Sequence, residues 1–295
     1  MSQTWKQDKD GFSAQFITNW EDLVDLLACF QDGKWIYRGQ SQDWPLKTSL
    51  ERRLGAWGIK LSSGPRVEHQ LIREFRRRFQ GAELDDVRRD KLFCLALMQH
   101  HGAPTRLLDC TYSPFVAAQV AVKDGQTIEN SRIGICVEYG RAAHVIWCFR
   151  AEWLANQASS KVGYKKVQAR NTARNDRSFD ELYQNKQDEK FVLHDNPLRL
   201  NERLSIQQGI FLCPATVSSS FLSNLKSMDE WNSENNICKI VLDLELEKLI
   251  QFARKLRRMN ISSAALFPGL DGFSRSLGEH LFHYDELAQM GAGPA

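Results

Sequence analysis

Residues Gln99–Ala118 gather side chains of nearly every kind that catalysis or ligand binding uses. They include two histidines, an arginine, an aspartate and several hydroxyl groups. Imidazole and carboxylate groups can transfer protons, and a guanidinium group can hold a phosphate through two parallel hydrogen bonds. A merely structural connection rarely needs all of these groups. We therefore take this stretch as the centre of the candidate site.

The pattern around this stretch predicts the elements that hold it. Lys91–His101 has apolar residues at helical spacing, and the glycine and proline that follow within three residues are typical of a helix end. Thr105–Thr111 fits a short buried strand. Ser113 followed by Pro114 predicts the start of a second, buried helix. The polar groups should then lie beside a helix N-terminus, whose unpaired N–H groups can bind an anion.

The composition of the 295 residues, with 42% hydrophobic and 25% charged side chains, is that of an ordinary soluble globular protein. No apolar run approaches the ~20 residues of a membrane span, and the polar start lacks a signal-peptide core. We therefore expect a cytoplasmic protein without membrane contact. The cysteines are odd in number and form no CxxC pair, which predicts buried thiols and no zinc or other metal site. The net charge of +3 is too small to indicate nucleic-acid binding.

Several common catalytic motifs are missing from the chain. The absence of GxGxxG and GxxxxGK[ST] removes the usual support for Rossmann, P-loop and kinase functions. The absence of GxSxG does the same for an α/β-hydrolase. The adjacent His100 and His101 would point ~100° apart on a helix, so they should not hold one metal ion together.

Four blocks of sequence together resemble the FRG domain, a family characterised by a Phe/Tyr-Arg-Gly motif. In chain order the blocks are Tyr37–Gln40 with the Trp-Pro-Leu, Ser-Leu and Arg that follow it by residue 52, then Gln99–Ala118, Asn201–Phe211 and Leu266–Phe273. They span residues 35–280 in the order that the family has them. Cys110 departs from the family, which more often has an aromatic residue there, and this departure concerns a contact rather than the chemistry.

We predict a mixed α+β fold with a mainly antiparallel central sheet and flanking helices, similar to the ADP-ribosyltransferases. Residues 1–18 are expected to be a polar N-terminal arm, and residues 19–290 a single FRG-type domain. Around residues 151–199 the apolar pattern weakens, which predicts a polar insertion, a mobile loop or a partner-binding arm. Further strands are expected at 34–39, 133–139, 144–149 and 237–242, helices at 20–30, 66–79, 245–259 and up to about 283, and an extended segment or short strand at 262–267.

The order of these elements also resembles ADP-ribosyltransferases of the Arg–Ser–Glu type. An arginine ends an early strand, a Thr/Ser-containing strand leads into a buried helix, and a Gln or Glu lies near a later strand. This resemblance implies NAD as the substrate of a transferase or NAD glycohydrolase that acts as a bacterial toxin or antiviral, phage-defence effector. It also implies a protein or nucleic-acid acceptor and an antitoxin or sensor protein as partners.

The candidate residues follow from that chemistry, in which positive charge builds on the ribose as nicotinamide leaves. The catalytic candidates are Arg38, His100, Asp109, Glu202 and Gln208. The NAD-binding candidates are Arg38, Gly39, Gln40, Thr105, Arg106 and Thr111. Asp109 or Glu202 would supply the carboxylate, and Gln208 would be a neutral orienting group.

The binding candidates have roles that suit a dinucleotide. The guanidinium of Arg38 could contact phosphate in a bidentate way that lysine could not reproduce. Gly39 would allow the ligand to approach the backbone closely. Thr105, Arg106 and Thr111 could bind ribose hydroxyls or phosphate.

Two other functional classes fit the same residues. Arg38, His100 and Asp109 could serve a nuclease or another phosphoryl-transfer enzyme. The chain could also be a ligand- or protein-sensing module without catalysis. A purely structural interpretation has Arg38 and Asp109 forming a buried ion pair that stabilises the core.

Overall fold

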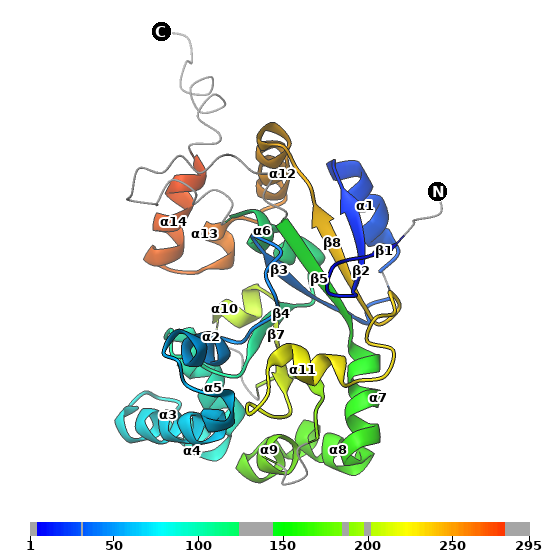
Figure 1. The fold of residues 1–295 in the computed structure, drawn as a ribbon. Coiled ribbons are helices and arrows are strands. Elements are labelled where there is room, and N and C mark those ends of the chain that lie inside the picture. Colours follow the sequence, from blue (N-terminus) through cyan, green and yellow to red (C-terminus); the bar gives the residue numbers. More distant parts are fainter. Residues whose placement is uncertain (1–4, 31, 124–143, 185–188, 198–201, 281–295) are drawn as a thin grey trace.

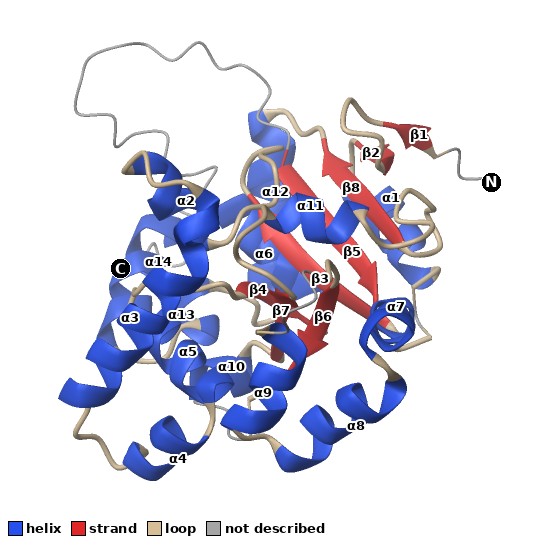
Figure 2. Cartoon of the chain, turned by 60° about the horizontal axis from the view of Figure 1, so that its bottom comes forward, coloured by secondary structure: helices blue, strands red, loops and turns tan. Residues whose placement is uncertain are grey.

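The computed structural model describes residues 5–30, 32–123, 144–184, 189–197 and 202–280. An eight-stranded sheet lies at its centre, with helices on both faces (Figures 1 and 2). The strands are β1 (Lys6–Gln7), β2 (Ser13–Ile17), β3 (Trp35–Gln40), β4 (Leu108–Thr111), β5 (His144–Arg150), β6 (Val192–Asp195), β7 (Gly209–Pro214) and β8 (Ile237–Leu242). Their spatial order is β1-β2-β8-β5-β3-β4-β7-β6. Neighbours are antiparallel except β2 and β8, which confirms the mixed α+β fold and the mainly antiparallel sheet.

Strands β5 and β8 are buried on both faces, which explains why their sequences are mainly apolar. Lys239, the charged residue within β8, is buried and bonds to Asp43 at 2.7 Å. Alternate side chains face two different hydrophobic clusters. Ile146 and Cys148 join the cluster on one face, whereas Val145, Trp147 and Phe149 join the cluster on the other. Successive side chains thus point to opposite faces of the sheet, as in any strand, but both faces are apolar and the sequence shows no alternation of polar and apolar residues.

Two sets of helices cover the two faces of these strands. The cluster on one face includes residues from α1 (Trp20–Ala28), α6 (Pro114–Lys123) and α12 (Leu246–Arg258). The cluster on the other includes residues from α5 (Lys91–His100), α7 (Ala151–Val162), α8 (Tyr164–Ala173), α9 (Asp176–Tyr183) and α11 (Phe221–Lys226). Helices α3 (Gly64–Arg78) and α4 (Leu84–Arg89) also contribute Ile72 and Val87 to this second cluster. The remaining helices are α2 (Ser49–Ala56), the 3-10 helix η1 (Leu61–Ser63), α10 (Glu202–Ile206), α13 (Ser263–Leu266) and α14 (Leu270–His280).

The expected N-terminal arm is instead part of the sheet. Strand β2 pairs in parallel with β8 from Ser13 opposite Cys238 to Ile17 opposite Leu242. Phe12 and Ala14 are almost fully buried against the central strands. The prediction of an arm at residues 1–18 is thus wrong for residues 6–17, because a five-residue strand among polar neighbours carries too weak a pattern to recognise.

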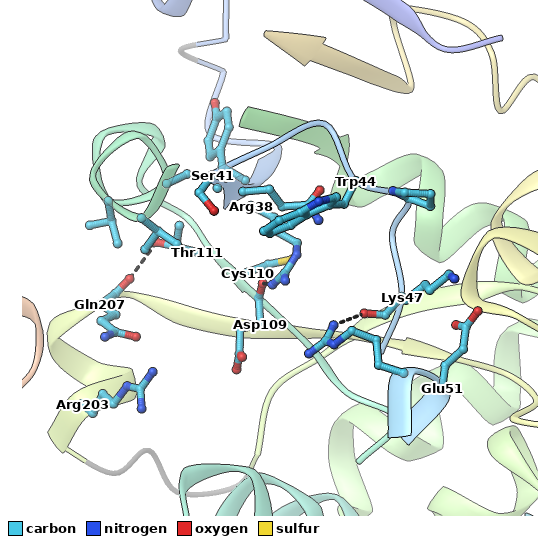
Figure 3. Close-up of a pocket in the computed structure, with 18 of the residues that line it drawn as sticks. Arg38, Ser41, Trp44, Lys47, Glu51, Asp109, Cys110, Thr111, Arg203 and Gln207 are labelled. Carbon is cyan, nitrogen blue, oxygen red and sulfur yellow. Dashed lines mark hydrogen bonds between the residues drawn. The ribbon is translucent and has the colours of Figure 1, made fainter. Parts of the chain in front are cut away.

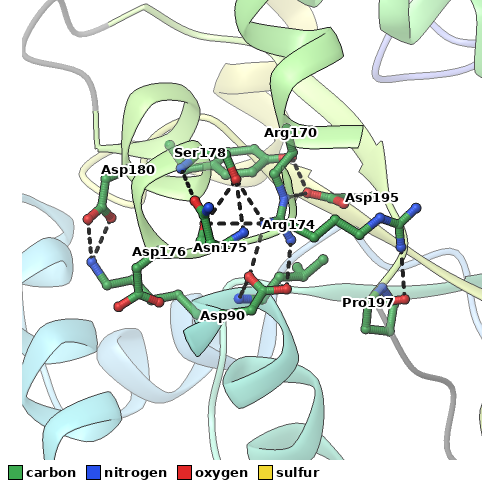
Figure 4. A network of polar contacts seen from close by, with 12 residues as sticks. Asp90, Arg170, Arg174, Asn175, Asp176, Ser178, Asp180, Asp195 and Pro197 are labelled. Atoms are coloured by element: carbon green, nitrogen blue, oxygen red, sulfur yellow. Dashed lines mark hydrogen bonds and ion pairs between the residues drawn. The ribbon is translucent and has the colours of Figure 1, made fainter. Parts of the chain in front are cut away.

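The polar segment at residues 151–199 contains helices α7, α8 and α9 and strand β6, so the expectation of a loop is wrong for these residues. Its polar side chains bind one another and the rest of the fold (Figure 4). Arg170 on α8 is fully buried, with its Nε 2.7 Å from Asp195 Oδ2 on β6 and its Nη1 2.9 Å from Asp90 Oδ1. Asp90 also caps α5 through the N–H of Leu92. Buried charges are stable only when paired, so this network requires an ordered segment.

The expected extended segment at residues 262–267 is helical. Ser262 accepts a hydrogen bond from the N–H of Ala265 at 3.3 Å and so caps α13, which is too short to show helical periodicity. The strand expected at 133–139 lies outside the described residues. The other predicted helices and strands are confirmed to within a few residues, as far as the structure describes them. No helix in the described ranges is long and apolar enough to cross a membrane.

Candidate functional site

The candidate site lies where strands β3 and β4 meet. These strands share a single pair of opposed residues, Tyr37 and Thr111, whereas β3 pairs with β5 along its whole length. A cavity of about 830 Å³ adjoins this meeting point, between the end of β3, helix α2, strand β4 and helix α6 (Figure 3). The charged and aromatic residues that line it are Tyr37, Arg38, Trp44, Lys47, Glu51, Arg52, Asp109, Arg203 and Phe267.

Arg38 joins the two strands through its side chain. Its Nη1 donates a hydrogen bond of 2.6 Å to the main-chain carbonyl of Asp109 on β4. Its Nε is buried and has no hydrogen-bond partner among the described residues. The carboxylate of Asp109 instead accepts a hydrogen bond of 2.8 Å from Gln99 Nε2 at the end of α5. The alternative of a buried Arg38–Asp109 ion pair is therefore wrong, and Asp109 is an exposed carboxylate at the cavity.

The cavity contains more basic than acidic side chains. Four basic residues line it, against the two acids Glu51 and Asp109. Burial, and then the positive charge of Arg38, lower the pKa of Arg52, whose Nη1 donates to the carbonyl of Lys47 at 2.6 Å. Two guanidinium groups thus lie close together in a partly buried space, and an anionic ligand between them would relieve their repulsion.

The two acids have different environments. Burial raises the pKa of Glu51, although its Oε2 accepts a hydrogen bond of 3.0 Å from the N–H of Phe221, at the start of α11. Figure 3 shows Glu51 and Lys47 on one side of the cavity, with Arg203 and Gln207 on the opposite side. Asp109 lies between the two sides, which makes it the carboxylate best placed to contact a bound ligand.

Five of the predicted site residues line the cavity, namely Arg38, Gly39, Gln40, Asp109 and Thr111. Like Arg38 and Asp109, Gln40 and Thr111 form side-chain hydrogen bonds within the protein. Gln40 Oε1 accepts a hydrogen bond of 2.6 Å from the indole of Trp147, and the hydroxyl of Thr111 donates to the carbonyl of Gln207 at 2.7 Å. These contacts hold the wall of the cavity in place.

Gly39 has a different role from the one expected. A Cβ atom built on it would lie 2.0 Å from the carbonyl oxygen of Ala117. Glycine is therefore required because helix α6 packs directly on strand β3, and the expected reason, close approach of a ligand, is not needed to explain it.

The other predicted residues are outside the main cavity. Arg106 is buried, and its Nε donates a hydrogen bond of 2.8 Å to Glu68 Oε1. It therefore forms an ion pair in the core, and its assignment to NAD binding is wrong. Thr105 is also fully buried, and its hydroxyl bonds to the side chain of Gln99. Glu202 and Gln208 are exposed and line neither the main cavity nor the smaller one beside it.

The structure brings the neighbours of Glu202 and Gln208 to the site instead. Arg203 and Gln207 both line the main cavity, and Arg203 lies over the ring of Phe267 with its Cζ 4.7 Å from the centroid. Gln208 is displaced because it occupies a left-handed turn with φ +48° between α10 and β7. His100 lines the smaller cavity, which shares Asp109, Arg203 and Gln207 with the main one.

Sequence reasoning missed several lining residues, although most belong to the four FRG-like blocks. The missed residues are Trp44, Lys47, Glu51, Arg52, Arg203, Gln207 and Phe267. Their positions within or beside these blocks could have identified them, because all four blocks contribute residues to one cavity. Within the described ranges, no three His, Cys, Asp or Glu side chains are grouped so that they could hold a metal ion.

The site is thus a basic cavity built around an Arg-Gly strand end and suited to an anionic ligand. The family model described as the FRG domain matches residues 33–130, so the chain carries an FRG domain. Searches of curated proteins and of solved structures gave no match. The matched segment includes Arg38, Arg52 and Asp109, whereas Arg203 and Phe267 reach the same cavity from beyond it.

Proposed function

We propose that the cavity binds NAD and that the chain cleaves the bond between nicotinamide and ribose. The observation that carries this proposal is the placement of two arginines, Arg38 and Arg52, around a cavity whose exposed carboxylate is Asp109. Arginine side chains bind phosphate oxygens in pairs, which suits the pyrophosphate of NAD. A carboxylate can stabilise the positive charge that develops on the ribose as nicotinamide departs.

The size and the aromatic lining of the cavity support this assignment. Its volume of about 830 Å³ is in the range of pockets that enclose a ligand of this size. Trp44 is 51% exposed, whereas tryptophan side chains in folded proteins are normally buried for the most part. Stacking of adenine or nicotinamide on this ring would cover it.

The reaction follows from these positions. The bond from ribose C1′ to the nicotinamide nitrogen breaks, and its electron pair neutralises the pyridinium ring. Asp109 faces the cationic ribose, while Arg38 and Arg52 hold the pyrophosphate. A nucleophile, either water or a group on an acceptor molecule, then bonds to C1′ and loses a proton.

Nicotinamide release provides the test. The purified chain is incubated with NAD, with and without a cell extract, and nicotinamide, free ADP-ribose and ADP-ribosylated products are measured by mass spectrometry. We expect release by the wild-type chain and a loss of at least about tenfold in Arg38→Lys, which keeps the charge but not the bidentate geometry. Trp44→Ala should raise KM, whereas Trp57→Ala, which is 73% exposed and does not line the cavity, should behave as wild type.

The other functional classes predict different results in the same experiment. NAD that quenches the fluorescence of Trp44 but stays intact would contradict cleavage and favour a ligand-sensing module. Degradation of nucleic acid that requires a divalent cation, without nicotinamide release, would favour a nuclease. If the chain is an NAD-consuming toxin or defence effector, its expression in bacteria should lower cellular NAD, and Arg38→Lys should abolish this effect.

A further inference from the structure

A second, much smaller cavity lies beside the main one. Its volume is about 40 Å³, and it shares Asp109, Arg203 and Gln207 with the main cavity. Bulk water occupies about 30 Å³ per molecule, so the small cavity has room for one water and not for a macromolecular side chain. Its other polar lining residues are Gln99 and His100, so a water there has several hydrogen-bond partners.

The protein holds His100 in a defined position relative to Asp109. His100 is the last residue of α5, and the preceding residue, Gln99, donates a hydrogen bond of 2.8 Å to Asp109 Oδ1. The other atom of the Gln99 amide, its oxygen, accepts from the hydroxyl of the buried Thr105. Both ends of the amide are therefore occupied, which ties the end of α5 to strand β4 and places the imidazole and the carboxylate around the same small space.

We propose that this cavity holds the attacking water and that His100 accepts its proton, an inference that rests on the proposed function. The chain would then be an NAD glycohydrolase. The water oxygen bonds to ribose C1′ as the bond to nicotinamide breaks, and the electron pair of that bond leaves with nicotinamide. One water proton passes to an imidazole nitrogen of His100 and then to solvent. The products are ADP-ribose, nicotinamide and one proton.

The charges around His100 suit a proton acceptor. Partial burial, followed by the positive charges of His101 and Arg203, lowers the pKa of His100, which favours the neutral imidazole. His101 contacts the same ring edge-on, with centroids 5.1 Å apart, and Asp109 lies across the cavity. An imidazole with this protonation state is a competent general base near neutral pH.

His101 provides a matched control, because it is exposed like His100 but lines neither cavity. We expect His100→Gln to lower kcat for nicotinamide release about 100-fold with little change in KM, whereas His101→Gln keeps kcat within about threefold. The wild-type rate should fall with acidification as His100 becomes protonated, and this dependence should be absent from His100→Gln. Equal rates for wild type and His100→Gln, or the same loss in both variants, would overturn the assignment.

Chemical rescue separates a proton acceptor from a structural residue. Removal of the ring in His100→Ala enlarges the small cavity, and added imidazole should then restore nicotinamide release in a concentration-dependent way. The role of His100 as the base is contradicted if His100→Ala has the thermal midpoint of the wild type but imidazole does not restore its rate. If the wild-type chain releases no nicotinamide at all, both this inference and the proposed function fail. Release that His100→Gln retains contradicts only the role of His100.

The nature of the product tests the water cavity itself. We expect ADP-ribose as the main product even when a cell extract supplies acceptors. With methanol present, methyl-ADP-ribose should form in less than its molar share, because the small cavity favours water. Products attached mainly to macromolecules would show that the nucleophile enters from elsewhere and would overturn the assignment of this cavity to water.

Discussion

The guanidinium of Arg38 bonds to the main-chain carbonyl of Asp109 and not to its carboxylate. Arg38 is one residue from Tyr37 and Asp109 two from Thr111, the single opposed pair of β3 and β4, so a side-chain hydrogen bond supplements a short strand pairing. It also leaves the Asp109 carboxylate to be positioned by Gln99. Arg38 thus shapes the cavity that it also lines.

Loss of Arg38 should affect both stability and binding. Arg38→Ala removes a charged hydrogen bond, which is worth about 1.5–3 kcal/mol, and it separates β3 from β4 at the cavity. We expect a decrease of this order in the free energy of unfolding, measured with urea, together with loss of NAD binding. Arg53 is an exposed arginine on α2 that does not line the main cavity, so Arg53→Ala should change neither.

Asp109→Asn should separate catalysis from binding. The substitution removes the negative charge that would stabilise the ribose cation, but it keeps the main-chain carbonyl that holds Arg38. We expect kcat to fall about 10²–10³-fold with a small change in KM, measured by nicotinamide release. Glu202→Gln, the other predicted carboxylate, should leave kcat unchanged because Glu202 is outside both cavities. The reverse result would assign the carboxylate to Glu202.

Two glycines that line the cavity should respond oppositely to alanine. In Gly39→Ala the new Cβ would meet the carbonyl of Ala117 at 2.0 Å, so the variant should lose about 1–3 kcal/mol of stability. Gly55 lies in helix α2 with no atom within 4 Å of such a Cβ, so Gly55→Ala should gain up to about 1 kcal/mol. Thermal unfolding of the two variants tests the pair. An unchanged midpoint for Gly39→Ala would contradict the packing of α6 on β3.

The buried ion pair of Arg106 and Glu68 should matter for folding alone. Glu68→Gln leaves a fully buried guanidinium without its counter-charge, which should cost about 3–5 kcal/mol. Glu74→Gln on the same helix removes an exposed partner of Arg77 and should have little effect, because water screens that pair. Urea unfolding measures the difference. Folded Glu68→Gln at low temperature should still bind NAD, since neither partner lines the main cavity.

His194 should make the protein less stable in acid. Burial lowers its pKa from 6.5 to about 4, and its Nδ1 has no hydrogen-bond partner among the described residues. Below pH 6.5 the unfolded chain binds a proton that the folded chain does not, so stability present above pH 6.5 is lost as the pH falls to about 4. The loss should be about 3 kcal/mol relative to His194→Asn. The free energies of unfolding at pH 7.5 and 4.5 test this, with the exposed His69→Asn as the control.

Much of the secondary structure was predictable because it depends on local patterns. The apolar runs of β5 and β8 and the amphipathic pattern of α12 predict their elements directly. Helices α7, α8 and α9 were not recognised, because their few core residues, such as Val167 and Phe179, lie among polar residues whose partners are elsewhere in the chain. Arg170, for example, pairs with Asp90 and Asp195, which are 80 and 25 residues away.

The candidate site, like the secondary structure, was predictable only in part. The types and order of its residues, an arginine at a strand end and an aspartate in a later strand, are properties of the sequence alone. Tertiary structure decided which of two similar arginines faces the cavity: Arg38 does, whereas Arg106 is buried against Glu68 from α3. It also brought Arg203 and Phe267 to the same place. The physical reason is that spacing predicts the direction of a side chain within its own element, whereas its partners depend on how distant elements pack.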